Sequence, residues 1–134
     1  MGVQDDIELV RRGFEAFIAG DVEWMNEHLH ENVVWHSPGH NVLSGDYRGR
    51  ESVLAFFAKT VQVALPEFDM HDIVASDDHV VAIFTINWRR NDNGQTFEDR
   101  VAQVFHVENG QALEVWTMTE DQAGFDKFLE GVQA

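Results

Sequence analysis

The sequence predicts an α+β fold for a single domain over residues 1–134, and three observations lead to this prediction. Apolar residues recur at helical spacing through most of the first half of the chain, and they alternate with a period of two through most of the second half. A length of 134 residues suits one domain that can bury a core. A hydrophobic fraction of 44%, with ten Phe and four Trp, indicates a globular protein and is typical of small domains that line a cavity with aromatic rings.

Helices are predicted where apolar side chains recur every three or four residues between capping and breaking signals. The predicted helices cover residues 5–19, 22–29, 51–64 and 121–132. Gly20 ends the first helix, Asp21 caps the second, and Pro66 ends the third. The first three helices therefore precede most of the predicted strands.

Strands are predicted where β-branched and aromatic residues are bounded by turn residues. The predicted strands cover residues 33–36, 68–75, 80–89, 97–107 and 112–119. The first is followed by the loop Ser37-Pro38-Gly39, and the last four are joined by short turns rich in Asp, Asn and Gly. Helices followed by a meander of long antiparallel strands are typical of an α+β fold.

Alternation along the strands predicts two faces that both carry large apolar groups. One face holds Phe84, Ile86, Trp88, Asp99, Val101, Gln103, Phe105, Val115, Thr117 and Thr119. The other holds Val81, Ile83, Arg100, Ala102, Val104, His106, Trp116 and Met118. Helices can cover one face, and a second subunit is the simplest cover for the other, so we expect a homodimer through the outer sheet face.

Charge and composition argue against several classes of function. The formal net charge is −15 with nine scattered Lys and Arg, which disfavours binding to nucleic acid and to anionic membrane surfaces. The chain has no Cys, which excludes disulfides, thiolate catalysis and Cys-type zinc sites. No apolar run has the length of a membrane span and the N-terminus shows no signal-peptide pattern, so we expect a cytoplasmic protein.

Several local strings, in their order along the chain, resemble the SnoaL-like branch of the ketosteroid isomerase and nuclear transport factor 2-like superfamily. The strings are Ala19-Gly20-Asp21, Ser37-Pro38-Gly39, Ser44-Gly45-Asp46-Tyr47-Arg48-Gly49-Arg50, Val104-Phe105-His106-Val107-Glu108-Asn109-Gly110, Glu114-Val115-Trp116 and Asp121-Gln122. The resemblance implies a cone-shaped, curved antiparallel sheet wrapped around the N-terminal helices, that is, a cystatin-like α+β barrel. It also implies an apolar cavity, with the Gln103 face turned inward and the Trp116 face outward.

The catalytic groups that this resemblance would imply are not retained. A ketosteroid isomerase has a carboxylate base where this chain has Ser37, a tyrosine donor near Gly13, and a carboxylic acid donor at Gln103. The polar acid/base groups of SnoaL-like polyketide cyclases fall at about Gln103 and Thr117. Both sets of chemistry would therefore need other residues.

Other polar residues are candidates for proton transfer inside the cavity. His36 or His40, paired with Asp99 or Asp121, could move a proton on a bound carbonyl compound, although strict alternation from Ser37 points His36 outward. The predicted catalytic residues are His36, His40 and Asp121. The predicted ligand-binding residues are Phe14, Trp35, Ser37, Tyr47, Phe57, Phe84, Trp88, Asp99, Gln103, Phe105 and Thr117. Gln103 is equally consistent with a ligand anchor and with a structural amide satisfied by Thr117.

Histidine spacing does not favour a metal site. His28 and His30 point to different sides of a helix, and His36 and His40 would need a loop to bring them together with a carboxylate. We therefore expect neither a metal nor an organic cofactor.

Two classes of function remain open on the sequence alone. The first is an enzyme, an isomerase or a cyclase- or dehydratase-type lyase, that moves a proton on an apolar carbonyl-bearing metabolite. The second is a non-catalytic module that carries an apolar small molecule or associates with another protein.

Overall fold

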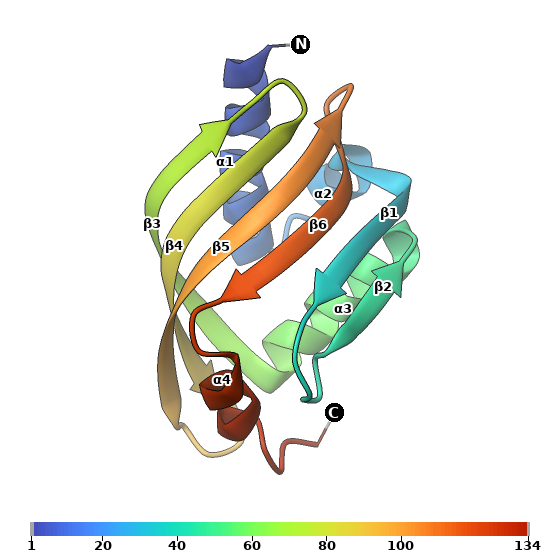
Figure 1. Ribbon diagram of the computed structural model, residues 1–134. Coiled ribbons are helices and arrows are strands. Elements are labelled where there is room, and N and C mark those ends of the chain that lie inside the picture. Colours follow the sequence, from blue (N-terminus) through green and yellow to red (C-terminus); the bar gives the residue numbers. More distant parts are fainter. Residues whose placement is uncertain (1, 134) are drawn as a thin grey trace.

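The computed structural model describes residues 2–133, which form four helices and a six-stranded sheet (Figure 1). The helices are α1 (Val3–Ala19), α2 (Val22–His28), α3 (Arg50–Val63) and α4 (Gln122–Phe128). The strands are β1 (Leu29–Ser37), β2 (Gly45–Arg48), β3 (Ala64–Ala75), β4 (His79–Arg90), β5 (Thr96–Glu108) and β6 (Gln111–Thr119). This arrangement confirms the predicted α+β class.

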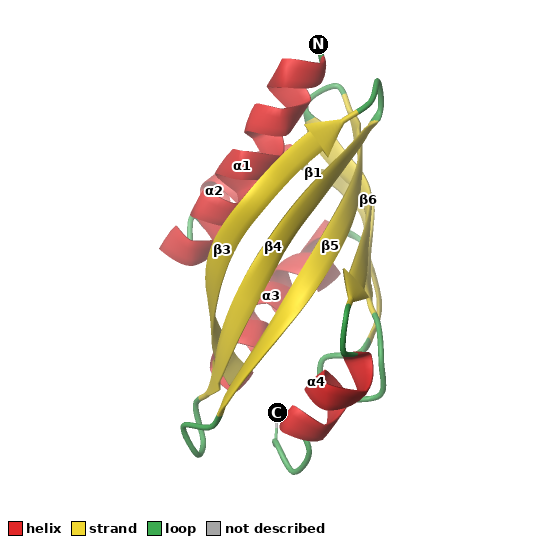
Figure 2. Ribbon diagram, turned by 60° about the vertical axis from the view of Figure 1, so that its left-hand side comes forward, coloured by secondary structure: helices red, strands yellow, loops and turns green. Residues whose placement is uncertain are grey.

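The sheet is bent and unclosed, with strand order β2-β1-β6-β5-β4-β3. Neighbouring strands are antiparallel except β1 and β6, which run parallel, a feature that the prediction of an antiparallel sheet missed. Helices α1, α2 and α3 lie on the concave side of the sheet, and α4 lies at the end where β6 stops (Figures 1 and 2). The hollow of the cone is therefore enclosed by the sheet on one side and by helices on the other.

The termini of several elements differ from the prediction for local reasons. Strand β3 begins at Ala64 and includes Pro66, which pairs with Trp88. Because β3 is an edge strand, the missing N–H of proline does not break a ladder on both sides. Strand β1 begins at Leu29, where the prediction continued the second helix, and β2 was not predicted.

Caps position the two short helices. The Asp21 side chain accepts a hydrogen bond from the Trp24 N–H at 3.0 Å, and Gly20 takes the left-handed conformation, φ 69°, at the end of α1. The Asp121 side chain accepts from the Gly124 N–H at 2.9 Å and starts α4. Helix α4 ends at Phe128, four residues before the end of the predicted helix.

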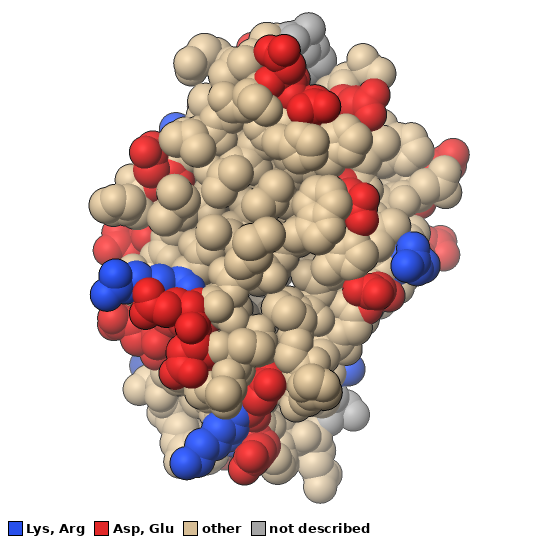
Figure 3. Space-filling view, viewed as in Figure 1, with Lys and Arg blue, Asp and Glu red and all other residues tan. Residues whose placement is uncertain are grey.

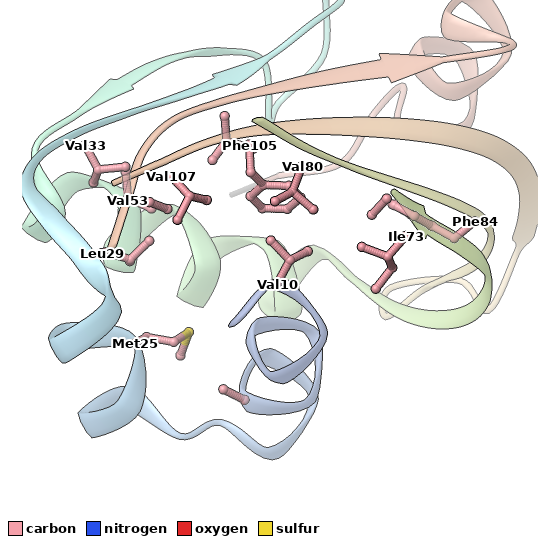
Figure 4. Close-up of a cluster of buried hydrophobic side chains, with 14 of the residues drawn as sticks. Val10, Met25, Leu29, Val33, Val53, Ile73, Val80, Phe84, Phe105 and Val107 are labelled. Atoms are coloured by element: carbon pink, nitrogen blue, oxygen red, sulfur yellow. The ribbon is translucent and has the colours of Figure 1, made fainter. Parts of the chain in front are cut away.

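The core lies between the concave face of the sheet and the helices (Figure 4). Val33, Val53, Val80 and Val115 have no exposed side-chain surface in the fold. Phe84 and Phe105 from the sheet and Val10 and Met25 from the helices belong to the same buried cluster. Burial of a side chain of this kind contributes roughly 1.5–3 kcal/mol each, so the cluster holds the helices against the sheet.

The convex face of the sheet is mostly uncharged (Figure 3). Most Asp, Glu, Lys and Arg side chains in this view lie toward the margin of the face, while Glu114 of β6 contacts His36 on the same face. Ile83 and Met118 are 40% and 55% exposed there. Within residues 2–133, none of the helices is both long enough and apolar enough to cross a membrane.

Candidate functional site

A cavity of about 190 Å³ lies between the concave face of the sheet and the four helices. Eleven of its thirty lining residues are Phe or Trp. The aromatic lining residues are Phe14, Phe17, Trp24, Trp35, Phe56, Phe57, Phe68, Phe84, Trp88, Phe105 and Phe125. Phe14 anchors this wall from α1, because its ring meets those of Phe68 and Phe84 edge to face at 5.1 and 5.2 Å between centroids.

Ten of the eleven residues predicted to bind a ligand line this cavity. They are Phe14, Trp35, Ser37, Phe57, Phe84, Trp88, Asp99, Gln103, Phe105 and Thr117. Those on β4, β5 and β6 share one face by alternation, the face that the family resemblance implies to be inward, and the pairing of Gln103 with Ala82 and Thr117 keeps these strands in register. Tyr47 does not line the cavity: its ring stacks on Phe56 at 4.2 Å and its hydroxyl donates to the Leu43 carbonyl at 2.9 Å.

Asp99 provides a carboxyl group in this apolar surrounding. The residue is 5% exposed, and its Oδ1 accepts hydrogen bonds from the backbone N–H groups of Arg100 at 2.9 Å and Asp121 at 3.2 Å. No described residue donates a hydrogen bond to its Oδ2. Burial raises the pKa of the Asp99 carboxyl above its usual value of 3.8, and the two backbone hydrogen bonds oppose that effect. A carboxyl group held by one oxygen and free at the other is suited to proton transfer.

Gln103 and Thr117 form a second polar position in the cavity. The Gln103 Nε2 donates to the Thr117 Oγ1 at 3.0 Å, across paired positions of β5 and β6. This bond uses one of the two amide hydrogens of Gln103 and one acceptor position of the Thr117 hydroxyl. The pair therefore keeps hydrogen-bonding capacity for a ligand while each member is partly satisfied by the other.

Gln122 closes one end of the cavity and was not predicted as a site residue. Its Oε1 accepts from the Thr119 hydroxyl at 2.8 Å, and its Nε2 donates to the Asp126 carboxylate at 3.0 Å. Gln122 lines the cavity together with Pro38, whose carbonyl lies 3.3 Å from the Gln122 Nε2. The string Asp121-Gln122 pointed to this region, but only the packing of α4 shows that the amide faces inward.

His36 does not reach the cavity, so its predicted role as a cavity acid/base group is wrong. Its Nδ1 lies 2.7 Å from the Asp46 carboxylate and its Nε2 lies 2.6 Å from the Glu114 carboxylate. His36 pairs with Trp116 across β1 and β6, and the two rings are nearly parallel on the convex face at 5.9 Å. Regular alternation continues through Trp35 and Ser37, which line the cavity, and this turns His36 away.

The other two predicted catalytic residues also lie outside the cavity lining. His40 is exposed in the loop between β1 and β2. Asp121 is exposed and caps α4 with its carboxylate, while its backbone N–H donates to Asp99. Asp121 therefore positions Asp99, and Asp99 itself is the carboxyl group inside.

Two further observations concern metal-binding groups and the opposite end of the cavity. Among residues 2–133, no three His, Asp or Glu side chains are arranged to hold a metal ion. His28 lines the cavity from α2, but its Nδ1 lies 2.8 Å from the Trp24 carbonyl and its ring stacks on Trp24 at 4.0 Å.

A bent sheet around helices with one aromatic cavity defines a class of small pocket proteins, and comparison with known proteins places the chain within it. The model of the SnoaL-like domain matches residues 10–115. The chain therefore belongs to the SnoaL-like domain family, as the sequence strings predicted.

Other known proteins are similar to this chain over nearly its whole length. The uncharacterized protein Rv0034 of Mycobacterium tuberculosis is 27% identical over 126 residues, which covers 92% of this chain and 95% of the relative. The structure of Bal32a from a soil-derived mobile gene cassette is 28% identical with a TM-score of 0.84, covering 96% of this chain and 98% of that one. An NTF2-like protein from Burkholderia xenovorans shares the fold at 21% identity, with a TM-score of 0.90 and coverage of 97% and 99%.

Proposed function

We propose that this protein binds an apolar ketone in its aromatic cavity and that Asp99 moves a proton on the carbon next to the carbonyl group. The observation that carries the proposal is the buried Asp99 carboxyl, whose Oδ2 has no hydrogen-bond donor among the described residues in a mostly apolar cavity. This role replaces the one that the sequence suggested for His36 and His40.

The cavity provides the conditions that such a step needs. Asp99 Oδ2 takes the proton as the C–H bond breaks, the C–H electron pair forms a C=C bond, and the C=O π pair moves onto the oxygen. The carboxyl proton exchanges with solvent, and Asp99 then returns a proton to carbon as the C=O bond forms again. The raised pKa of Asp99 makes the carboxylate a stronger base than an exposed aspartate. The Thr119 hydroxyl and the Gln122 amide, joined by a hydrogen bond of 2.8 Å, are the other polar groups of the lining at this end of the cavity.

The test is exchange of the α-hydrogens of cyclic and aryl ketones in D₂O, followed by NMR with and without the protein. The wild type should accelerate exchange of a ketone that fits. Asp99→Asn should reduce that acceleration by about a hundredfold or more, because asparagine cannot take the proton. Asp69→Asn, on exposed β3 surface, is the matched control and should leave exchange unchanged.

The stability of Asp99→Asn shows whether a loss of exchange activity comes from the missing base or from unfolding. The folded-state pKa of Asp99 is raised, so ionisation of its carboxyl lowers the free energy of unfolding as pH rises above 3.8. Asparagine keeps an Oδ1 acceptor for the backbone N–H groups of Arg100 and Asp121, so Asp99→Asn should be more stable at neutral pH by on the order of 1 kcal/mol. If Asp99→Asn catalyses exchange of the ketone as fast as the wild type does, Asp99 is not the base.

The second candidate is a carrier that binds the same ligands without chemistry. It is favoured by the mutual hydrogen bond of Gln103 and Thr117, which resembles a structural amide pair. Ketones that bind tightly to the wild type, with no acceleration of exchange for any of them, would select this candidate.

A further inference from the structure

We infer that the ligand is a neutral, single-ring ketone with a second polar group at the far end of the ring, such as a para-substituted acetophenone. This inference rests on the proposed function, because it names the class of ketone that the same cavity takes. Three features of the cavity carry it: its volume, its charge, and the spacing of its two polar positions.

The volume limits the ligand to one ring. A cavity of about 190 Å³ is only moderately larger than an apolar cavity of about 150 Å³ that holds benzene. One ring with short substituents fits this space, whereas a fused tricyclic or tetracyclic ketone would extend beyond it. The Phe14 ring meets that of Phe68 edge to face, and the Trp35 ring meets that of Phe57 in the same way. Aromatic walls of this kind suit a flat ring.

The charge of the wall excludes an anionic ligand. Within the described residues, the lining includes the carboxyl group of Asp99 and no Lys or Arg. The single imidazole of the lining, His28, is on α2 with its Nδ1 occupied by the Trp24 carbonyl. Helix α2 lies at the end of the sheet opposite to α4, and Asp99 lies beside the start of α4, so His28 is no counter-ion for a group near Asp99 (Figure 1). A carboxylate in this cavity would lose its hydration without a cationic partner.

The spacing of the polar positions favours a ligand with two polar groups. Asp99 and Gln103 point to the same face of β5 and are four residues apart, which is about 13 Å along an extended strand. One carbonyl group cannot reach both. A ligand that places its ketone at Asp99 directs the opposite end of its ring along β5 toward Gln103 and Thr117, where a hydroxyl or a second carbonyl finds donors and acceptors.

Binding of four aryl ketones to the wild-type protein tests this inference. Trp24, Trp35 and Trp88 line the cavity, so fluorescence quenching reports occupancy, and calorimetry gives the affinity. We expect 4′-hydroxyacetophenone to bind about tenfold more tightly than acetophenone and than 2′-hydroxyacetophenone, because only the para isomer adds a hydrogen bond at the far end. We expect 4-acetylbenzoate, which carries a carboxylate at that position, to bind at least tenfold more weakly than 4′-hydroxyacetophenone.

The double variant Gln103→Met/Thr117→Val is the matched control, since it removes both members of the hydrogen-bonded pair without leaving one unsatisfied. It should bind acetophenone like the wild type and lose the tenfold preference for the para-hydroxyl group. Circular dichroism and retained acetophenone binding show that the variant is folded.

Several results would overturn the inference. Equal binding of the hydroxyl isomers, tight binding of 4-acetylbenzoate, preference for a steroid ketone, or no binding of any ketone would each contradict it. The proposed function fails separately: if para-substituted acetophenones bind as expected but their α-hydrogens exchange at the uncatalysed rate, the ligand class stands and the role of Asp99 as a base does not.

Discussion

His36 illustrates how a single side chain acquires a role that its neighbours in sequence do not suggest. Its ring is held between the carboxylates of Asp46 and Glu114, at 2.7 and 2.6 Å, and its side chain is 26% exposed. These hydrogen bonds, that to Glu114 first, favour the charged ring and raise the pKa of His36 above 6.5. The same contact lowers the pKa of Asp46 below 3.8. Through His36, strand β1 is joined to both of its neighbours.

The first residue-scale prediction concerns the pH dependence of stability. A raised pKa in the folded state means that the contribution of His36 is fully present below pH 6.5 and is lost as pH rises through the folded-state pKa. His36→Gln should therefore lower the melting temperature by a few degrees near pH 6 and by much less near pH 10. Thermal denaturation of wild type and variant across this pH range checks the prediction. His30→Gln is the control, because among the described residues the His30 ring is hydrogen-bonded only to the nearby backbone N–H of Asn32. A difference between wild type and His36→Gln that stays constant with pH would contradict the assignment.

At the scale of elements, the loop between β1 and β2 and helix α4 close one end of the cavity together. The Asn41 side chain donates to the Asp126 carboxylate at 2.6 Å, and Gln122 reaches the Pro38 carbonyl at 3.3 Å. Gly39 makes this docking possible, because a Cβ at that position would overlap Gln122 and Asp126, and its φ of 94° is in the region that favours glycine. The close approach of the loop to α4 therefore depends on one missing side chain.

Gly39→Ala should destabilise the fold by about 1–3 kcal/mol and loosen α4 in particular, because the overlap displaces Gln122 and Asp126. The control is Gly94→Ala. Gly94 also has a positive φ, 73°, but its Cβ position is surrounded by open space, so this variant should lose only about 1 kcal/mol of unfolding free energy, from the unfavourable backbone conformation. Hydrogen exchange of the α4 amides, read beside the free energy of unfolding, measures the effect. If both variants lose the same free energy of unfolding and the α4 amides exchange equally in both, the overlap of a Cβ at position 39 with Gln122 and Asp126 does not affect stability.

At the scale of the whole molecule, the mostly uncharged convex face of the sheet is left uncovered by the helices of the chain. The side chains at its centre come from β4, β5 and β6, while acidic residues surround it (Figure 3). Ile83 and Met118 are among its exposed apolar residues. The homodimer through this face, expected from the alternation of the strands, stays a prediction.

Sedimentation velocity tests the dimer. The wild type should sediment at twice the chain mass of 15.3 kDa, and Met118→Lys should weaken the dimer by about tenfold or more by placing a charge at the centre of the interface. Ile18→Lys changes another exposed apolar residue, which lies on α1 away from the convex face, and should leave the dimer intact. A wild-type protein that is monomeric at all concentrations would rule the interface out.

Local signals along the chain were sufficient for much of this description. Helical periodicity, caps and turn residues predicted the helices and five of the six strands. Strict alternation sorted the side chains of β4, β5 and β6 onto two faces, and the family resemblance indicated which face lines the cavity. Asp99, Gln103 and Thr117 could be identified in this way because the two-residue period is a property of each strand by itself.

Only the tertiary structure decided which groups meet. His36 and Glu114 are 78 residues apart, and the parallel pairing of β1 with β6 that joins them leaves no local signature in either strand. The same holds for Gln122, whose amide faces the cavity because α4 folds back against Pro38, and for Asp99, whose carboxyl is held by the backbone of Asp121. Sequence patterns report the period of each element, whereas burial, hydrogen-bond partners and the resulting pKa arise only when distant elements pack together.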